Sequence, residues 1–322
     1  MTQKRISRVS ARAKPSSRML RFAQGLIPLG PKMLTWFPER PSQLVLGWAL
    51  ARFPKLWGIS IEGTRVQKSR RAFELAFPDE DADELLADWM RARGRGMATT
   101  LGYLARWSKG RRTRLMRTAP EFKLPEGPCV VAFLHFSFEP IGQLACIAAS
   151  PDDLNIRLPI MPMQPGLEDD RALWLGNQAV PSRIDDAFLP VTDPSWMATA
   201  VDHLRAGGTI FISIDSPFDS SMTPESSISV GQAQMPLSPS VELFARVENV
   251  QLAFAWPTPK SRSSWVIDVK PAADVEELAK LSGEWIEEYR QHWAGLTFLV
   301  WREKVTEMRA NVKKIQARSV KG

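Results

Sequence analysis

Continuous apolar runs alternate with amphipathic stretches through the middle of the chain, from about residue 125 to residue 271. An apolar run of about four to eight residues between turn residues is typical of a strand buried on both faces of a parallel sheet. The runs predict strands at Cys129–Leu134, Leu154–Ile160, Phe188–Val191, Thr209–Ile214, Gln251–Trp256 and Trp265–Val269. The stretches between them predict helices at Ile141–Ala149, Glu168–Leu175, Pro194–Arg205 and Pro239–Val247. Strands that alternate with helices favour an α/β fold, with a mainly parallel sheet flanked by helices.

Helical segments are predicted on both sides of this region. The acidic residues 79–81 suit a helix N-terminus, and a long helix is predicted from Asp81 to about Leu104. Closing helices are predicted at Ala273–Leu296 and Thr306–Ala317. We therefore expect one α/β domain over residues 61–322, preceded by a helical, basic N-terminal region.

That N-terminal region, residues 1–60, is both basic and partly apolar. Residues 1–21 hold seven Lys or Arg residues and no acid, a composition that is attracted to polyanions. Pro41–Ala51 is uncharged for 11 residues, whereas a membrane-spanning helix needs about 20, and no signal peptide is predicted. Gln43–Phe53 is predicted to be either an amphipathic helix in a membrane interface or a cover over the domain core.

The charge balance suggests an anionic partner. The formal net charge is +7, and Arg91–Arg117 contains nine basic residues and no acid. We expect these residues to bind an anionic membrane surface or an acidic carrier protein. We expect no nucleic acid, because no nucleic-acid-binding motif accompanies the basic runs. Cys129 and Cys146 lie in apolar runs and are predicted to be buried thiols in a reducing compartment. With three histidines and no Cys/His cluster, no metal site is predicted.

Candidate chemistry lies where the first predicted strand ends. His135 follows the apolar run Val130–Leu134, and Glu139 comes four residues later, just before Pro140. Pro suits the first turn of a helix, so the two side chains lie at a strand-to-helix junction, the edge where open α/β sheets bind ligands. An imidazole oriented by a carboxylate can deprotonate a hydroxyl group. The simpler alternative is a structural hydrogen-bonded pair. Ser137 would share a face with His135 on an extended chain and is an alternative nucleophile.

This stretch resembles part of a known enzyme family. Phe133-Leu134-His135-Phe136-Ser137-Phe138-Glu139-Pro140 is similar to the first block of the bacterial lipid A biosynthesis lauroyl/myristoyl acyltransferases, a branch of the glycerolipid acyltransferases. The family block has four residues between His and the acid, whereas this chain has three. Blocks similar to further parts of the family follow in the same order, between about Ile61 and Lys304, at Arg65–Pro78, Leu204–Asp215, Val230–Ala245 and Ala253–Pro257.

The resemblance implies an O-acyltransferase of lipid A biosynthesis, and hence of lipopolysaccharide biosynthesis, with a glycerolipid acyltransferase-like fold. It implies transfer of a fatty acyl group from an acyl carrier protein or coenzyme A thioester to a hydroxyl of a lipid or glycolipid acceptor. His135 would be the general base, oriented by Glu139, with no cofactor beyond the thioester co-substrate. The implied location is the cytoplasmic face of a bacterial inner membrane, held peripherally. The acceptor, the acyl chain length, the choice of donor and the oligomeric state stay open.

The short spacing between His135 and Glu139 supports an alternative function. It suits a weak or inactive homologue that binds acyl chains or acyl carrier protein without transferring the acyl group. The alternative keeps the fold and the binding partners and loses the chemistry. A direct assay of acyl transfer separates the two.

Several residues are candidates for substrate binding. Asp215 ends a predicted strand, where it is either a site residue or a cap for the next loop. Ser238 is predicted to cap the helix Pro239–Val247, whose N-terminus is either an anion site or simply capped. The resemblance also implies an Arg ahead of the Leu204–Asp215 block, for which Arg171 and Arg183 are the candidate substitutes. The full set of substrate-binding candidates is Ser137, Arg171, Arg183, Asp215, Gly231 and Ser238.

Overall fold

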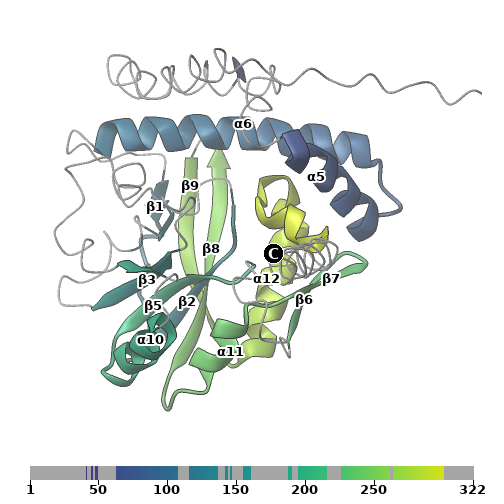
Figure 1. Cartoon of the computed structure of the whole chain (residues 1–322). Helices are drawn as coiled ribbons and strands as arrows, with labels where there is room; N and C mark the ends of the chain where they lie inside the picture. The colour runs from purple at the N-terminus through teal and green to yellow at the C-terminus, as the bar shows by residue number, and fades with distance from the viewer. Residues whose placement is uncertain are drawn as a thin grey trace, which may run out of the picture.

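The computed structural model describes residues 63–107, 116–136, 155–160, 188–190, 195–215, 226–261 and 264–300, together with residues 41, 45, 48, 49, 142, 143 and 146. The described residues form an α/β fold around a seven-stranded, mainly parallel sheet (Figure 1). The strand order is β1-β9-β8-β2-β5-β3-β4. The strands are β1 Met116–Thr118, β2 Cys129–Phe133, β3 Ile156–Ile160, β4 Phe188–Pro190, β5 Thr209–Ser213, β8 Gln251–Ser261 and β9 Ser264–Ala272.

The centre of the sheet forms where the sequence is most continuously apolar. Strand β2 is buried at every position and pairs in parallel with β5 on one side and β8 on the other. Strands β3 and β4 continue the parallel ladder beyond β5. A strand covered on both faces needs no polar alternation, which explains the uninterrupted run. The α/β class and the mainly parallel sheet predicted from the sequence are confirmed.

One edge of the sheet departs from the parallel arrangement. Strands β8 and β9 form an antiparallel pair, and β1 pairs in parallel with β9. Strand β8 extends to Ser261, although the sequence predicted an end at Trp256 before two prolines. The ladder between β2 and β8 reaches only Phe254. Pro257 and Pro259 therefore follow the part of β8 that is paired on both sides, and proline is tolerated there.

Three helices pack along the sheet in strand order. Helix α10 (Trp196–Arg205) contacts β3, β4 and β5, α11 (Pro239–Ala245) contacts β2, and α12 (Val275–Tyr289) contacts β8 and β9. Helix α12 begins at an N-cap whose carboxylate, from Asp274, accepts the Glu277 N–H at 2.8 Å. Its buried face includes Trp285, whose indole N–H donates to the Pro257 carbonyl at 2.8 Å.

Two helices that precede the sheet in the sequence pack beside the carboxyl ends of its central strands. Helices α5 (Gly63–Ala76) and α6 (Ala82–Trp107) pack on each other, and α6 runs above the carboxyl end of β8 in Figure 1. Arg290, which follows α12, donates to both oxygens of Glu80 at 2.7 and 2.6 Å. Its guanidinium lies 4.8 Å from the centre of the Phe77 ring. These contacts hold the α5–α6 pair to the C-terminal part of the chain, at the edge where β2 ends.

Several elements differ from their predicted extents. The predicted helix Ala273–Leu296 is wrong in its C-terminal part, where α12 gives way to the 3₁₀ turns η2 (Arg290–His292) and η3 (Gly295–Val300). The sequence predicted a loop through residue 234, whereas the structure has the antiparallel hairpin of β6 (Ser227–Val230) and β7 (Ala233–Pro236).

Other predicted elements fall partly or wholly outside the described residues. The predicted helices Glu168–Leu175 and Thr306–Ala317 lie outside them, as does most of the N-terminal region 1–60. In the predicted helix Ile141–Ala149, residues 142, 143 and 146 are described and are helical. Within the described ranges, no helix combines the length and the apolar composition that crossing a membrane requires.

Both cysteines are buried free thiols, as predicted. Burial raises the pKa of the Cys129 thiol to about 12 and also raises the pKa of Cys146. A thiol is nucleophilic only as the thiolate. Neither cysteine is therefore suited to covalent catalysis.

Candidate active site

Two adjacent strands bring His135 and Asp215 together. Strands β2 and β5 pair in parallel with Phe133 opposite Ser213, and the Ile214 N–H donates to the Phe133 carbonyl at 2.9 Å. His135 and Asp215 each lie two residues beyond the last paired position of their strand. In a parallel ladder, equal offsets give neighbouring positions. The strand register therefore places an imidazole beside a carboxylate at the carboxyl edge of the sheet.

The Asp215 carboxylate is fully buried and accepts three N–H groups. Its Oδ1 lies 2.6 Å from His135 Nδ1 and 3.1 Å from the His135 backbone nitrogen. Its Oδ2 lies 2.9 Å from the same backbone nitrogen and 2.7 Å from Trp293 Nε1. A buried carboxylate is costly unless hydrogen-bond donors replace the lost water. The three donors explain how an acid is accommodated with 0% exposure.

The carboxylate also assigns the proton on the His135 ring. Because Asp215 accepts from Nδ1, the neutral imidazole carries its proton on Nδ1 and its basic lone pair on Nε2. The His135 side chain is 29% exposed, while Asp215 is completely buried. A partly exposed base backed by a buried carboxylate, which stabilises the imidazolium form, is the arrangement required of a general base.

The backbone around His135 is held as firmly as its ring. The Phe136 N–H donates to the Leu134 carbonyl at 2.8 Å, which bends the chain sharply at His135. The His135 carbonyl accepts the N–H groups of Ala294 and of Gly295, the latter at 3.2 Å. The imidazole therefore projects from a backbone that is fixed on both sides.

The structure places Asp215 against the His135 ring, whereas the family resemblance implied Glu139 as the orienting acid. Glu139 lies outside the described residues, as do the candidates Ser137, Arg171 and Arg183. The available sequence signal was that His135 and Asp215 each directly follow a five-residue apolar-rich run, at 130–134 and 210–214. The pairing of these two strands was the missing information.

Gly231, a predicted substrate-binding residue, lies in the turn between β6 and β7. It has a positive φ of 53°, and its N–H donates to Glu287 Oε1 at 2.9 Å. A Cβ atom at this position would lie 2.1 Å from the Ala76 carbonyl oxygen. The neighbours of Gly231 are thus protein groups of α5 and α12, and local packing explains why glycine stands here.

Ser238 precedes α11 but does not cap it through its side chain, so the capping prediction is wrong. Its backbone is extended, and its hydroxyl makes no capping hydrogen bond. The hydroxyl lies 3.5 Å from the Ser240 hydroxyl instead, and the Ser238 N–H donates to the Ile214 carbonyl at 2.9 Å. With 1% exposure, Ser238 joins the start of α11 to the end of β5 inside the core.

Burial lowers the pKa of both other histidines. His203 Nε2 lies 3.2 Å from the carbonyl oxygens of both Asn155 and Thr209, and burial lowers the pKa of this ring. For His292, burial and the nearby charge of Arg95 lower the pKa to about 4. Two acceptors at one ring nitrogen give His203 a structural role that joins α10 to β3 and β5.

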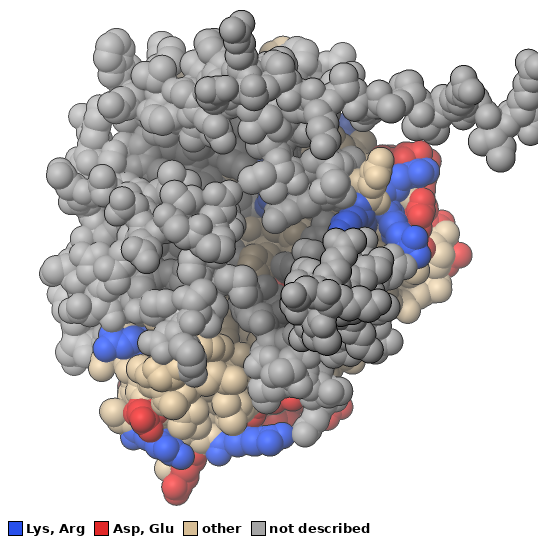
Figure 2. Space-filling model, in the orientation of Figure 1, with Lys and Arg blue, Asp and Glu red and all other residues tan. Residues whose placement is uncertain are grey.

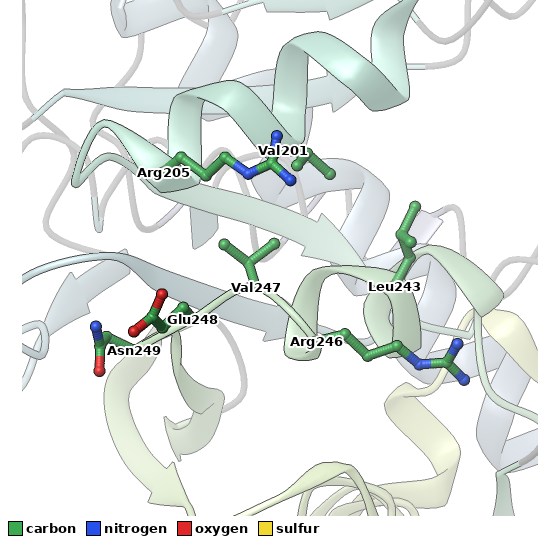
Figure 3. A pocket seen from close by; sticks show the side chains of 7 residues that line it. All are labelled: Val201, Arg205, Leu243, Arg246, Val247, Glu248 and Asn249. Atoms are coloured by element: carbon green, nitrogen blue, oxygen red, sulfur yellow. The ribbon is translucent and has the colours of Figure 1, made fainter.

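A surface hollow of about 600 Å³ lies away from the His135–Asp215 pair. Figure 3 shows its lining side chains, which come from the end of α10, the end of α11 and the loop before β8. These segments lead into the amino ends of β5 and β8, at the edge of the sheet opposite His135. Its polar lining comes from Arg205, Arg246, Glu248 and Asn249 and includes no histidine.

The charged surface near the start of α6 mixes both signs. Figure 2 shows blue and red side chains interspersed on the visible described surface. Arg70 on α5 donates to both oxygens of Asp83 on α6, at 2.9 and 3.3 Å. The described α5–α6 junction is therefore not a basic patch of one sign.

A scan against protein-family models gives no match for this chain, and a search of curated proteins gives none either.

Proposed function

We propose that this protein is an O-acyltransferase that moves a fatty acyl group from a thioester to the hydroxyl of a lipid or glycolipid acceptor. The observation that carries the proposal is the His135–Asp215 pair, with Nδ1 and Oδ1 2.6 Å apart. It lies at the carboxyl edge of a parallel sheet, where α/β folds bind ligands. The resemblance of several sequence blocks to the lipid A acyltransferases supplies the substrate class and suggests a glycerolipid acyltransferase-like fold.

In the proposed reaction, His135 is the catalytic base and Asp215 is a positioning residue. As the acceptor oxygen attacks the thioester carbonyl carbon, its proton passes to His135 Nε2. The new C–O bond gives a tetrahedral oxyanion, and Asp215 stabilises the imidazolium. The oxyanion then collapses, the C–S bond breaks, and the leaving sulfur takes the proton from Nε2. The products are an ester and a free thiol, and His135 returns to its neutral form.

The Asp215 contact also bears on the short spacing between His135 and Glu139. The alternative of a weak or inactive enzyme arose because only three residues separate His135 from Glu139, whereas the family block has four. Asp215, a buried acid two residues beyond β5, contacts the ring at Nδ1. This supports a working general base and weakens the motive for a binding protein without chemistry.

The test is an acyl-transfer assay with acyl carrier protein and coenzyme A thioesters, and with lipid A precursors and simpler lipids as acceptors. We expect turnover by the wild-type protein, and a loss of about 10²–10⁴-fold in His135→Ala, the range for removing a general base. Circular dichroism should show that the variant keeps its fold. An acyl group trapped on Ser137 would replace the direct mechanism with a two-step one. Equal activity of His135→Ala and wild type would favour the non-catalytic binder.

We further propose that the protein is held peripherally at the cytoplasmic face of a bacterial inner membrane. Residues 41, 45, 48 and 49 are helical, and Val45 and Trp48 are 67% and 64% exposed. An apolar helix face next to a basic segment gives two weak anchors that act together.

Vesicle flotation tests this location. Wild type should bind anionic vesicles at low salt, and a Val45→Glu, Trp48→Glu double variant should bind less. Leu75→Glu is the control, because Leu75 is also exposed, at 48%, but lies on α5. Equal binding of all three proteins would argue against the interfacial helix.

A further inference from the structure

The segment after α12 returns to the carboxyl edge of the sheet and reaches the His135–Asp215 pair. Trp293, which follows η2, is fully buried, and its indole N–H donates to Asp215 Oδ2 at 2.7 Å. Its backbone forms an isolated antiparallel bridge with Phe136. Its carbonyl accepts the indole N–H of Trp89, on α6, at 2.7 Å. The backbone of Trp293 is therefore fixed by Phe136 and by Trp89, while its indole donates to the Asp215 carboxylate.

The two carboxylate oxygens of Asp215 share the His135 backbone N–H but have different side-chain partners. Oδ1 faces the His135 ring, and Oδ2 faces the Trp293 indole. The last torsion of an aspartate side chain has a broad, shallow energy profile, so a further donor at Oδ2 restricts the rotation of the carboxylate beyond what the His135 donors achieve. An indole N–H can only donate. Its bond to Oδ2 fixes the carboxylate plane and, with it, the direction of the bond from Oδ1 to His135.

Gly295 shows how closely this segment packs on the carboxylate. A Cβ atom at position 295 would lie 2.2 Å from Asp215 Oδ2 and 2.6 Å from Trp293 Nε1. A real Cβ cannot approach so closely, so any other residue would displace the indole, the carboxylate or the backbone. The Ala294 and Gly295 N–H groups also donate to the His135 carbonyl. One short segment thus holds both members of the pair.

We propose that Trp293 is a positioning residue of the active site, acting on His135 through the Asp215 carboxylate. The expected effect on kcat rests on the proposed acyltransferase function. The expected effect on the orientation and titration of the His135 ring does not depend on that function. The indole N–H shares the negative charge of the carboxylate, so it moderates the attraction of Asp215 for the imidazolium and keeps the ring in its reactive orientation.

The variant that tests the proposal is Trp293→Phe, and Trp285→Phe is its matched control. Each change removes one indole N–H donor from a fully buried tryptophan. The Trp285 indole donates to the backbone carbonyl of Pro257, whereas the Trp293 indole donates to Asp215. Both variants lose similar volume and one hydrogen bond, and only one of them changes the carboxylate.

Three measurements on the full-length chain separate positioning from stability. In Trp293→Phe we expect kcat to fall by about 10- to 100-fold, the range known for losing a partner that orients a metal-binding side chain, with KM within about threefold. We expect the midpoint of the His135 ring titration, followed by NMR, and the acid limb of kcat/KM to move to higher pH. Trp285→Phe should lower resistance to urea by a similar amount and leave both pH midpoints in place.

The proposal is overturned if the two variants change kcat alike and neither moves the His135 titration. If wild type transfers no acyl group, the proposed function fails, and the NMR comparison still decides the role of Trp293. If Trp293→Phe does not fold, an NMR titration of the wild-type protein tests the proposal instead. One tryptophan Nε1–H resonance should titrate with the same midpoint as His135, and the absence of such a resonance would also overturn the proposal.

Discussion

Replacing Asp215 by Asn should trap His135 in the wrong tautomer. Three N–H groups converge on the carboxylate, two from His135 and one from Trp293. An Asn side chain offers one oxygen and one NH₂ group in the same space. The Trp293 indole can only donate, so the amide oxygen should face Trp293 and the NH₂ group should face His135 Nδ1. His135 must then accept at Nδ1 and carry its proton on Nε2, where the reaction needs a lone pair.

The size of the effect follows from this geometry. Loss of a carboxylate that sets the tautomer of a catalytic histidine lowers kcat by about 10³–10⁴-fold, which corresponds to about 4–5.5 kcal/mol of activation free energy. The change in stability should be smaller, because the amide oxygen can still accept from Trp293 and from the His135 backbone N–H, and Nδ1 accepts from the NH₂ group after the tautomer changes. Asp215→Ala would instead leave buried donors unpaired, at about 1–3 kcal/mol each. Asn is therefore the cleaner probe of chemistry.

The assay combines kcat with ¹⁵N NMR of the His135 ring, which distinguishes the Nδ1–H and Nε2–H tautomers. Removing the Trp293 donor should partly rescue the Asn variant, because the amide can then turn its oxygen toward His135. We expect the double variant Asp215→Asn, Trp293→Phe to be more active than Asp215→Asn alone. Independent, multiplicative losses would refute the tautomer argument. If Glu139→Gln, rather than Asp215→Asn, proved the more damaging single change, Glu139 would be the orienting acid.

Two further predictions concern stability. Gly231→Ala should lower the free energy of unfolding by at least about 1–3 kcal/mol, because Ala is strained at positive φ and its Cβ would meet the Ala76 carbonyl; urea denaturation measures this, and unchanged stability would contradict it. The pKa of His292 is about 4 in the folded protein and about 6.5 in the unfolded chain. As the pH is lowered, the unfolded chain therefore binds this proton at a higher pH than the folded protein does. Stability should therefore fall as the pH drops from about 6.5 to 4, by no more than about 3 kcal/mol, and His292→Gln should remove that part of the slope.

The sequence predicted those elements of the fold whose local pattern is strong. Strands β2 and β5 are continuous apolar runs that directly follow Gly-containing turns, and their types and positions were correct. Strand β8 was predicted too short because Pro257 and Pro259 normally end a strand, and only its departure from β2 makes them tolerable. The β6–β7 hairpin alternates buried and exposed positions, a half-buried strand pattern that the surrounding Ser and Pro residues hid.

The candidate site could be predicted only in part. His135 follows a buried strand and carries recognisable chemistry, so sequence reasoning found it. Its partner depends on the fact that β5, rather than β3, lies beside β2 in the sheet. Parallel strands that are neighbours in space need not be neighbours in sequence, and periodicity does not report strand order. Sequence proximity therefore pointed to Glu139 as the partner of His135, whereas Asp215, 80 residues away, could be recognised only from the fold.

Trp293 had no sequence signal at all, because tryptophan in an apolar segment usually means core packing. Its role becomes visible only when α6, β2, β5 and the segment after α12 are placed together, with Trp89 bonded to Trp293, Trp293 to Asp215, and Asp215 to His135. Each link joins residues that are distant in sequence, so none can form before the chain has folded. Because the last link fixes the proton on the His135 ring, the base is assembled by tertiary packing. A change that loosens the segment after α12 should therefore weaken the base even where the sheet itself is intact.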